Sequence, residues 1–574
     1  MTRALAVVVV AAAVAAGATA WALGRDAAPR ARAAGDRFVR ATPDGRMVDF
    51  ALVLRMPGER RIAAFLRDVN NPGSPRYRRF LSAWQFGRRF GLRQSVIAQA
   101  RAELRTRGLR VTRAFPQRTE LEVRGSARAL RRVFRVNLGE YRDRDGRRFH
   151  APLSRPVVPE KLSRAITGVA GLNTKPLPEK SLQGPNERGF FPKELARAYG
   201  FDKLWKSGIR GQGQSIAVYT ASTFNDDDVA RYDEATGTPG PHVCSSSART
   251  GCVEHVPVHG GVEDTDPEDA LDVETIHGIA PGATVLNYES KIGDASSASE
   301  YGKAFATSIA EVANQVVQDN RAHILSISYG LAEGGQFNGE QILTPEDRQI
   351  GERAFQQAVA HGVNIFVSSG DQGAYQCQQF DAADHRLCVA WPTDSPNVIS
   401  VGGTLLDVDK QGDYVEEAGW QDTLSAWGGG GGVSSHESRP SWQSGSVAGV
   451  ENKYSNGKRQ VPDVSGPASQ ASGIFVVYNG DGQPVGGTSA SSPFWAAIAA
   501  LITEQAQKQG AGKLPFLNPI FYRLAGSTQR SVFHDVERGG NRYYPATPGW
   551  DYATGLGSPM VDRLAPAIIR EVKR

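Results

Sequence analysis

The chain has 574 residues, with 66 Lys+Arg, 60 Asp+Glu, a net charge of +6 and 4 Cys. At about 150 residues per domain, this length predicts more than one domain and a large core. A 40% apolar fraction and 63 Gly exclude a largely disordered chain, a coiled coil and a small disulfide scaffold.

The charge is divided unevenly along the chain. Residues 1–174 hold 35 Lys+Arg and 13 Asp+Glu, a net of +22. The remaining 400 residues hold 31 and 47, a net of −16. Either the basic part binds nucleic acid or a membrane, or the two parts bind each other.

The N-terminus has the pattern of an export signal. Arg3 precedes an apolar run over residues 4–23, which contains the small-residue sequence Ala18-Thr19-Ala20. We expect residues 1–24 to form a signal peptide. A run of about 20 apolar residues could also span a bilayer, so an uncleaved N-terminal anchor is the alternative. No later run is as long and apolar, which predicts a secreted, soluble protein.

The four cysteines stand in two close pairs. Cys244 and Cys252 flank one short loop, and Cys377 and Cys388 flank another. Export would permit disulfides, and we expect two local bridges, although the sequence leaves three pairings open. Neither pair is a CxxC and no His lies at finger spacing, which argues against a zinc site.

Residues 36–174 mix short apolar runs, such as 48–55 and 120–123, with the amphipathic, Arg-rich stretch 95–108. This mixture predicts a small α+β domain. The following segment, residues 175–188 (KPLPEKSLQGPNER), is polar and contains Pro and Gly, as is typical of an exposed linker.

Beyond the linker, short β-branched runs alternate with helical patterns. The helical patterns cover residues 297–320 and 346–361, and the runs cover residues 215–220, 284–289, 323–328, 363–368, 397–401 and 473–478. This alternation predicts an α/β fold with a parallel sheet covered on both faces.

Ser489 is a candidate nucleophile. It follows Gly486-Gly487-Thr488, and Pro493 with an apolar run comes after it. The glycines permit a tight turn and Pro493 suits the first turn of a helix, where free N–H groups favour negative charge. A nucleophilic serine needs this setting, although a Ser/Thr-rich cap of a buried helix has the same pattern.

Glu268 and Asp272 form a candidate acid–base pair. Their i, i+4 spacing puts both carboxyls on one helix face, where one of them should retain a proton. The alternative is a solvated acidic helix start, because other Asp residues crowd this segment.

Asp371 is a third candidate. It follows an apolar strand within Ser369-Gly370-Asp371, and α/β active sites form at the carboxyl ends of parallel strands. An ordinary turn residue would fit the same position.

Together, the three segments resemble the sedolisin family of serine-carboxyl peptidases. The pattern is a Glu-x-x-x-Asp pair, then Ser-Gly-Asp, then Gly-Thr-Ser, and it stands here in that order. The resemblance covers roughly residues 36–574, including a propeptide signature at residues 74–81 (SPRYRRFL), and further matches lie at residues 278–283, 326–330, 395–398, 401–404 and 461–465.

The resemblance implies a subtilisin-like α/β catalytic domain over residues 189–574. A small α+β, ferredoxin-like activation prodomain would precede it over residues 36–174, and processing would occur within the linker at 175–188. The resemblance also implies that the protein is an endopeptidase, which is made as a self-processing zymogen and is inhibited by its own prodomain. We expect it to be monomeric, to act on proteins or peptides and to bind no nucleic acid.

The resemblance also implies roles for the candidate residues. Ser489 would be the nucleophile, Glu268 the general base and acid, and Asp272 its proton-sharing partner. Asp371 would form the oxyanion hole with the Ser489 N–H. An aspartic acid donates to an oxyanion only when protonated, so we expect maximal activity at acidic pH.

Ser328, Tyr329 and Gly330 are implied to line the cleft and to pair with extended substrate backbone. Some family members have Glu at the position of Thr220 and Trp at that of Tyr329. The carboxylate network is therefore expected to be shorter in this chain.

The resemblance implies one structural Ca²⁺ near the C-terminus. Its ligands would be the carboxylates of Asp535 and Asp551 and the carbonyls of Val536, Thr547 and Gly549. Oxygen donors of this kind suit a hard cation. Thr547 stands where relatives often have Gly, a mild departure because only its carbonyl is needed.

Two other peptidase interpretations remain open. One is a tripeptidyl-peptidase of the same family. The other is a subtilisin-type Ser-His-Asp enzyme that uses His277, although the five-residue spacing from Asp272 places the two side chains on different helix faces.

The uneven charge acquires a specific meaning in a zymogen. A +22 prodomain and a −16 catalytic part should attract each other near neutral pH. As the pH falls, carboxylates become neutral while Arg stays charged, so we expect the attraction to weaken and free the active site.

Overall fold

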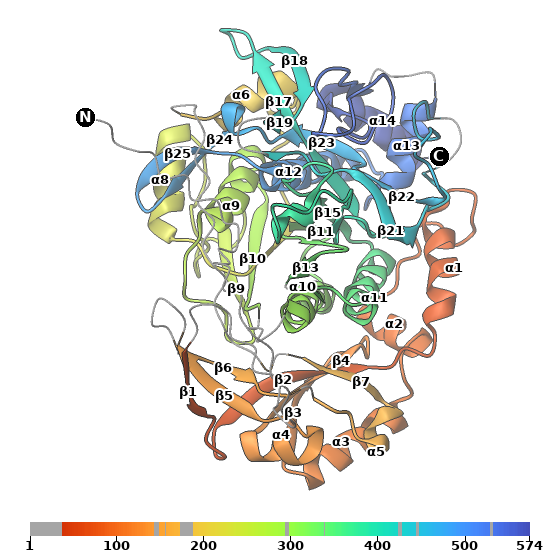
Figure 1. Cartoon of the computed structure of the whole chain (residues 1–574). Helices are drawn as coiled ribbons and strands as arrows, with labels where there is room; N and C mark the ends of the chain where they lie inside the picture. The colour runs from red at the N-terminus through yellow and green to blue at the C-terminus, as the bar shows by residue number, and fades with distance from the viewer. Residues whose placement is uncertain are drawn as a thin grey trace.

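A computed structural model describes residues 37–142, 148–154, 156–170, 172, 188–292, 298–337, 339–422, 427–443, 447–527 and 532–573. Figure 1 shows a small mixed domain, in red and orange, beneath a larger domain that contains the central sheet. The predicted signal segment and most of the predicted linker lie outside the described residues.

The small domain is built on a four-stranded antiparallel sheet. Its strands are β2 (Met47–Leu54), β3 (Leu109–Ala114), β4 (Glu120–Ser126) and β7 (Ile166–Ala170), in the order β3-β4-β2-β7. The helices α3 (Gln94–Thr106) and α4 (Ala127–Phe134) bury apolar residues against this sheet. The order is that of a ferredoxin-like βαββαβ unit, which confirms the predicted α+β prodomain.

Two helices join the small domain to the large one. The helices α1 (Glu59–Asn70) and α2 (Ala83–Arg89) both pack against α11 (Pro345–His361), at the right of Figure 1. Phe65, Phe86 and Phe90 belong to the same buried cluster as the core of the large domain. The Leu81 N–H donates to the Ala360 carbonyl at 2.8 Å, so backbone and apolar contacts both fix the interface.

The large domain contains the predicted parallel sheet. The strands run in the order β18-β17-β15-β11-β8-β10-β9, and β23 also pairs with β17. All neighbours are parallel except β18, which is antiparallel to β17. Their bounds are β8 (Ser215–Thr220), β9 (Val253–Val258), β10 (Thr284–Ser290), β11 (Ile324–Ile327), β15 (Asn364–Ser368), β17 (Ile399–Val408), β18 (Tyr414–Gly419) and β23 (Val464–Pro467).

Helices cover both faces of this sheet. Along β8, Ile216 and Val218 belong to the core that includes α9 (Pro267–Ile279) and α12 (Thr488–Lys508). The alternate residues Ala217 and Tyr219 belong to the core that includes α10 (Ala298–Asp319) and α11. Side chains alternate along a strand, so a sheet buried on both faces needs the nearly continuous apolar runs that the sequence contains.

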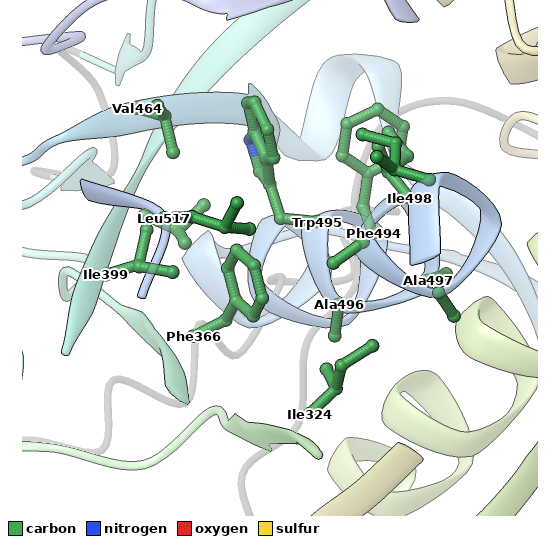
Figure 2. Close-up of a cluster of buried hydrophobic side chains, with 14 of the residues drawn as sticks. Ile324, Phe366, Ile399, Val464, Phe494, Trp495, Ala496, Ala497, Ile498 and Leu517 are labelled. Atoms are coloured by element: carbon green, nitrogen blue, oxygen red, sulfur yellow. The ribbon is translucent and has the colours of Figure 1, made fainter. Parts of the chain in front are cut away.

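The buried helix α12 forms the centre of one core. Figure 2 shows Phe494, Trp495 and Ile498 of α12 beside residues of the sheet, among them Phe366 and Ile399. The sequence predicted a helix with Pro493 in its first turn, but α12 begins at Thr488 and Pro493 lies inside it. The helix therefore starts one turn earlier, and the candidate nucleophile lies within it.

One predicted strand has a different partner. Residues 473–478 do form a strand, β24 (Ile474–Tyr478), but it pairs antiparallel with β25 (Asp481–Val485) outside the central sheet. The turn between them is Asn479-Gly480, with φ of 55° and 84°. Two positive φ values at Asn-Gly are typical of a two-residue hairpin, and this local signal decides the pairing.

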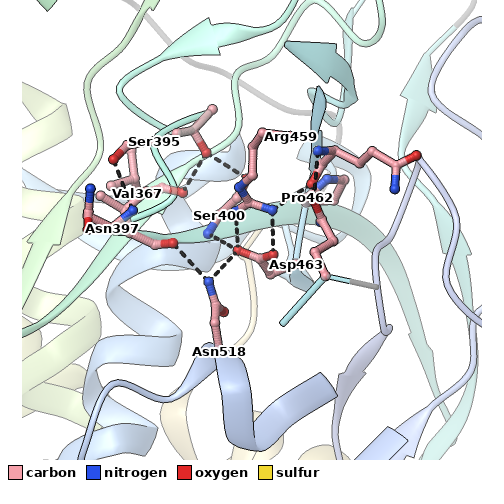
Figure 3. A network of polar contacts seen from close by, with 12 residues as sticks. Val367, Ser395, Asn397, Ser400, Arg459, Pro462, Asp463 and Asn518 are labelled. Atoms are coloured by element: carbon pink, nitrogen blue, oxygen red, sulfur yellow. Dashed lines mark hydrogen bonds and ion pairs between the residues drawn. The ribbon is translucent and has the colours of Figure 1, made fainter. Parts of the chain in front are cut away.

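A buried ion pair anchors the C-terminal third. Arg459 donates to both carboxylate oxygens of Asp463, at 2.8 and 2.6 Å, and neither side chain is exposed. Figure 3 shows that the Ser400 N–H and the Asn518 amide also donate to Asp463. These donors satisfy the buried carboxylate, which joins β17, the strand β22 (Lys458–Val461) and the helix α13 (Asn518–Gly526).

The remaining described elements complete the two domains. Disulfides join Cys244 to Cys252 and Cys377 to Cys388, with Cα atoms 5.1 and 5.9 Å apart, which is the local pairing expected from the sequence. No helix within the described ranges is long and apolar enough to cross a membrane. The other elements are β1 (Arg37–Ala41), β5 (Leu138–Arg142), β6 (Arg148–Pro152), α5 (Glu160–Ser163), α6 (Pro192–Tyr199), α7 (Asp202–Lys206), α8 (Asp226–Thr236), β12 (Leu331–Ala332), β13 (Gln336–Phe337), β14 (Glu340–Gln341), β16 (Ala390–Trp391), β19 (Gln421–Asp422), β20 (Trp427–Gly428), β21 (Gly432–Ser438), β26 (Phe533–His534), β27 (Ser558–Pro559) and α14 (Val561–Lys573).

Candidate active site

Ser489 lies in the first turn of α12 and is buried. The residue before the helix, Gly487, has a φ of 110°, a conformation that L side chains rarely adopt. A Cβ atom there would also stand 3.0 Å from Asp371 Oδ2. Gly487 is therefore required both for the backbone conformation and for the approach of Asp371 to the start of the helix.

Asp371 is held against the same helix end. It follows β15 through Gly370, and its Oδ1 accepts hydrogen bonds from the N–H and the Oγ1 hydroxyl of Thr488, each at 2.8 Å. The Gly370 N–H donates to Thr488 Oγ1 at 3.0 Å. These bonds place the Asp371 carboxyl one residue from Ser489, with Oδ1 occupied as an acceptor.

Glu268 and Asp272 lie on α9, which packs against α12. The Asp266 side chain caps α9 by accepting from the Glu268 N–H at 2.8 Å. Every residue of α9 is buried, so the alternative of a solvated acidic helix start is wrong. Burial and the neighbouring Glu268 carboxylate raise the pKa of Asp272 well above its ordinary value, as two close carboxyls sharing a proton require.

Ser328 connects this acidic pair to Ser489. Its hydroxyl donates to Asp272 Oδ1 at 2.6 Å, and its backbone carbonyl accepts from the Ser489 hydroxyl at 3.3 Å. The Ser328 hydroxyl also lies 3.3 Å from the Ser489 carbonyl. In a regular helix that carbonyl would bond to the N–H four residues later, but Pro493 has none, so the carbonyl is open to Ser328.

The neighbours of Ser328 lie beside the acidic pair. The ring of Tyr329 packs edge-on against Tyr219, with centroids 5.6 Å apart. Burial and the nearby carboxylates of Asp266 and Glu268 raise the pKa of Tyr329. The Gly330 carbonyl accepts from the Gln379 amide at 2.9 Å, so this expected substrate contact already has a partner within the chain.

The prediction from the sequence did not include one continuation of the acidic network. Asp269 is fully buried, and burial raises its pKa to about 8. It accepts from the Asn287 amide at 3.1 Å, and Asn287 in turn lies 3.4 Å from Glu289 on β10. Asp269 thus extends the network, even though this chain has Thr220 where some family members have Glu. Polar residues at alternate positions of an otherwise apolar strand were the signal that could have revealed it.

His277 belongs to a different cluster. Its Nε2 lies 3.1 Å from Asp233 Oδ2, and His242 contacts the same carboxylate oxygen. Five helical residues separate His277 from Asp272, about 7.5 Å along the axis of α9. Within the described part of the chain, it is Ser328 and not His277 that bonds to the Ser489 hydroxyl, which disfavours a Ser-His-Asp arrangement.

Comparisons with known proteins agree with this geometry. Residues 34–175 match the pro-kumamolisin activation domain, and residues 225–516 match the subtilase family. Sedolisin of Pseudomonas sp. (strain 101) is 30% identical over 551 residues, covering 91% of this chain and 87% of that protein. The chain belongs to the sedolisin family. It is therefore a serine-type peptidase with a subtilisin-like fold and an N-terminal activation domain.

Other sedolisin-family proteins give the same result. Kumamolisin of Bacillus sp. (strain MN-32) is 30% identical over 518 residues, covering 86% of this chain and 87% of that protein. A solved structure of Pseudomonas sedolisin, a serine-carboxyl proteinase complexed with two molecules of pseudo-iodotyrostatin, superposes with a TM-score of 0.55 at 30% identity. It covers 67% of this chain and 98% of the solved chain, consistent with a match to the large domain.

The calcium residues expected for a sedolisin surround one loop. The Gly549 N–H donates to both oxygens of Asp535, at 3.1 and 2.9 Å. The Thr547 N–H donates to Asp551 Oδ2 at 2.8 Å, and Asp551 is buried. The carboxylates of Asp535 and Asp551 thus both lie against residues 547–549, and carboxylate oxygens are donors that suit Ca²⁺.

A second acidic cluster lies where the prodomain meets the large domain. Glu120 on β4 is buried, and its carboxyl lies close to the Asn314 side chain of α10. His259 Nε2 lies 3.3 Å from Glu311 on α10, and both lie close enough to Glu120 to influence its charge. Burial and then Glu311 raise the pKa of Glu120 to about 8.

Proposed function

We propose that this sedolisin-family protein is an acid-acting endopeptidase that hydrolyses proteins or peptides through an acyl-enzyme on Ser489. The observation that carries the proposal is the position of Ser489. It lies at the start of α12, linked through Ser328 to Asp272 and through Thr488 to Asp371. These bonds support the proposal, because they connect the proposed nucleophile with one member of the acidic pair and with the carboxyl proposed for the oxyanion hole.

In the proposed reaction, Glu268 accepts the Ser489 hydroxyl proton while Oγ attacks the substrate carbonyl carbon. Asp272 shares the remaining proton of the pair and limits the build-up of charge. The tetrahedral oxyanion receives hydrogen bonds from the Ser489 N–H and from protonated Asp371. Glu268 then protonates the leaving amine. In the second step, Glu268 accepts a proton from the water that attacks the acyl-enzyme and returns a proton to Ser489 Oγ as it leaves.

Acidic conditions suit this arrangement for a physical reason. Asp371 Oδ1 already accepts two hydrogen bonds from Thr488, so the oxygen that donates to an oxyanion must be Oδ2 carrying a proton. That proton is present only when the pH is low enough for the carboxyl to be neutral. A pH–rate profile that peaks above neutrality would contradict the carboxyl mechanism.

The proposal extends to the rest of the precursor. The activation domain would inhibit the large domain until self-cleavage within residues 175–188, and the two disulfides suit an exported protein. One Ca²⁺, held by Asp535, Asp551 and the three backbone carbonyls, would join the C-terminal loops to the body. We propose that the mature enzyme is secreted and monomeric.

The test uses the full-length precursor, incubated at pH ~4 and followed by mass spectrometry and by peptide hydrolysis. The expected result is loss of the prodomain and internal cleavage of a long peptide, both abolished in the Ser489→Ala variant. Successive release of tripeptides from the N-terminus of the peptide would instead identify a tripeptidyl-peptidase. An active Ser489→Ala variant would refute the proposed nucleophile.

A further inference from the structure

The hydroxyl of Ser328 is placed to control where the acidic pair keeps its proton. Ser328 follows the carboxyl end of β11, and its side chain is buried. A serine hydroxyl has a single hydrogen to donate. The closer acceptor is Asp272 Oδ1 at 2.6 Å, whereas the Ser489 carbonyl lies at 3.3 Å. The hydrogen therefore goes to Asp272.

This bond restricts the protonation state of Asp272. A carboxyl oxygen that accepts from Ser328 is the unprotonated one, so a proton on Asp272 must sit on Oδ2. Oδ2 makes no hydrogen bond to a group in the described part of the chain and is available to hold it. When Asp272 holds the proton of the acidic pair, that proton is thus kept on Oδ2.

The same residue holds the nucleophile. The Ser328 carbonyl accepts from the Ser489 hydroxyl at 3.3 Å, and the Ser489 carbonyl, which Pro493 leaves without a helical donor, faces the Ser328 hydroxyl. Backbone and side chain of Ser328 thus contact both halves of the site. Its side chain is turned inward to Asp272 rather than outward to a substrate.

We propose that Ser328 is a positioning residue, which keeps Oδ1 of Asp272 an acceptor and thereby confines any proton that Asp272 holds to Oδ2. This inference rests on the proposed peptidase function. It departs from the expectation that Ser328 contributes mainly to substrate binding. The Ser328 backbone can still pair with substrate, but the hydroxyl acts through Asp272.

The test measures kcat, KM and the pH profile of mature Ser328→Ala. Hydrogen bonds to charged groups correspond to roughly a 10- to 100-fold effect, so kcat should fall by about that factor while KM changes less than about 2-fold. Without the donor that favours ionised Asp272, the acid limb of the pH profile should move to higher pH.

Ser326→Ala is the matched control. Ser326 lies two residues earlier, is equally buried, and bonds through its hydroxyl to Ser492 at 3.0 Å rather than to Asp272. Loss of the Ser326 hydroxyl should leave the pH profile unchanged. If Ser328→Ala fails to fold, the isosteric Ser328→Cys variant decides, because its weak thiol donor should also lower kcat and move the acid limb.

Ser328→Thr, which keeps a hydroxyl, should restore the wild-type pH profile. A raised KM with unchanged kcat and pH profile in the Ala or Cys variant would overturn the proposal and leave Ser328 as a substrate contact. The Ser489→Ala enzyme distinguishes failure of the proposed function from failure of the positioning role of Ser328. If it remains active, the proposed function fails, whereas an inactive Ser489→Ala with a Ser328→Ala of unaltered kcat refutes the positioning role alone.

Discussion

The buried carboxyl of Glu120 makes the contact between prodomain and large domain depend on a proton. Glu120 faces Glu311, His259 and Glu122, and the burial that raises its pKa to about 8 makes its neutral form the stable one. Burial also raises the pKa of Glu122, whereas Glu311 raises that of His259 to about 10. All three shifted groups hold protons more firmly in the folded precursor than in the unfolded chain.

The sign of the pH dependence follows from these shifts. A carboxyl whose pKa is raised in the folded state does not lower the free energy of unfolding at a pH below its ordinary pKa of 4.5. Above that pH the loss of stability grows until the pH reaches about 8. At about 1.4 kcal/mol per pH unit, Glu120 destabilises the precursor by roughly 3 kcal/mol at pH 7. His259 acts in the same sense, because its stabilisation is complete below pH 6.5 and is lost as the pH rises toward about 10.

Replacing Glu120 by Gln should remove the penalty, because the amide is neutral at every pH. In the Ser489→Ala background, which prevents self-cleavage, Glu120→Gln should raise the free energy of unfolding by up to about 3 kcal/mol at pH 7. Near pH 4.5 the two proteins should be equally stable. Urea unfolding at pH 4.5, 6 and 7.5 provides the measurement.

Glu140→Gln is the control, because Glu140 lies in the same domain but forms a partly exposed ion pair with Arg40. Its effect should be below about 1 kcal/mol and should not grow with pH. A Glu120→Gln effect that is equal at all three pH values, or destabilising at pH 7.5, would refute the proton-uptake argument. Because protonation favours this contact, any release of the prodomain by acid must come from carboxylates elsewhere.

Three further predictions concern the catalytic and structural sites. Glu268→Ala should reduce kcat by at least about 100-fold, whereas His277→Ala should keep the pH profile of the wild type; the reverse result would indicate a His-based mechanism. Chelation by EDTA should lower the melting temperature of the wild type but not that of Asp551→Ala, and an unchanged wild-type melting temperature would argue against a bound Ca²⁺. High salt at neutral pH should speed prodomain release if long-range attraction holds the two parts together, as measured by the rate of self-processing; no effect of salt would count against that attraction.

The sequence alone determined the fold class and the proposed location of the site. Continuous apolar runs such as that of β8 are required by a sheet buried on both faces, and they are visible without tertiary information. The turn before Ser489 and the spacing of Glu268 and Asp272 are local features in the same way. Each predicts a geometry within one helix or one turn, so each could be inferred from neighbouring residues.

Only the tertiary structure decided which distant groups meet. Ser328 lies 56 residues from Asp272 and 161 from Ser489, so no local pattern could show that its hydroxyl bonds to the first and its carbonyl to the second. The burial of Asp269 and Glu120 also depends on elements remote in sequence, and burial is what raises the pKa of each. The charge counts showed only that the prodomain is basic and that the large domain is acidic. Where a carboxyl retains a proton depends on desolvation and on neighbours in space, which the fold alone supplies.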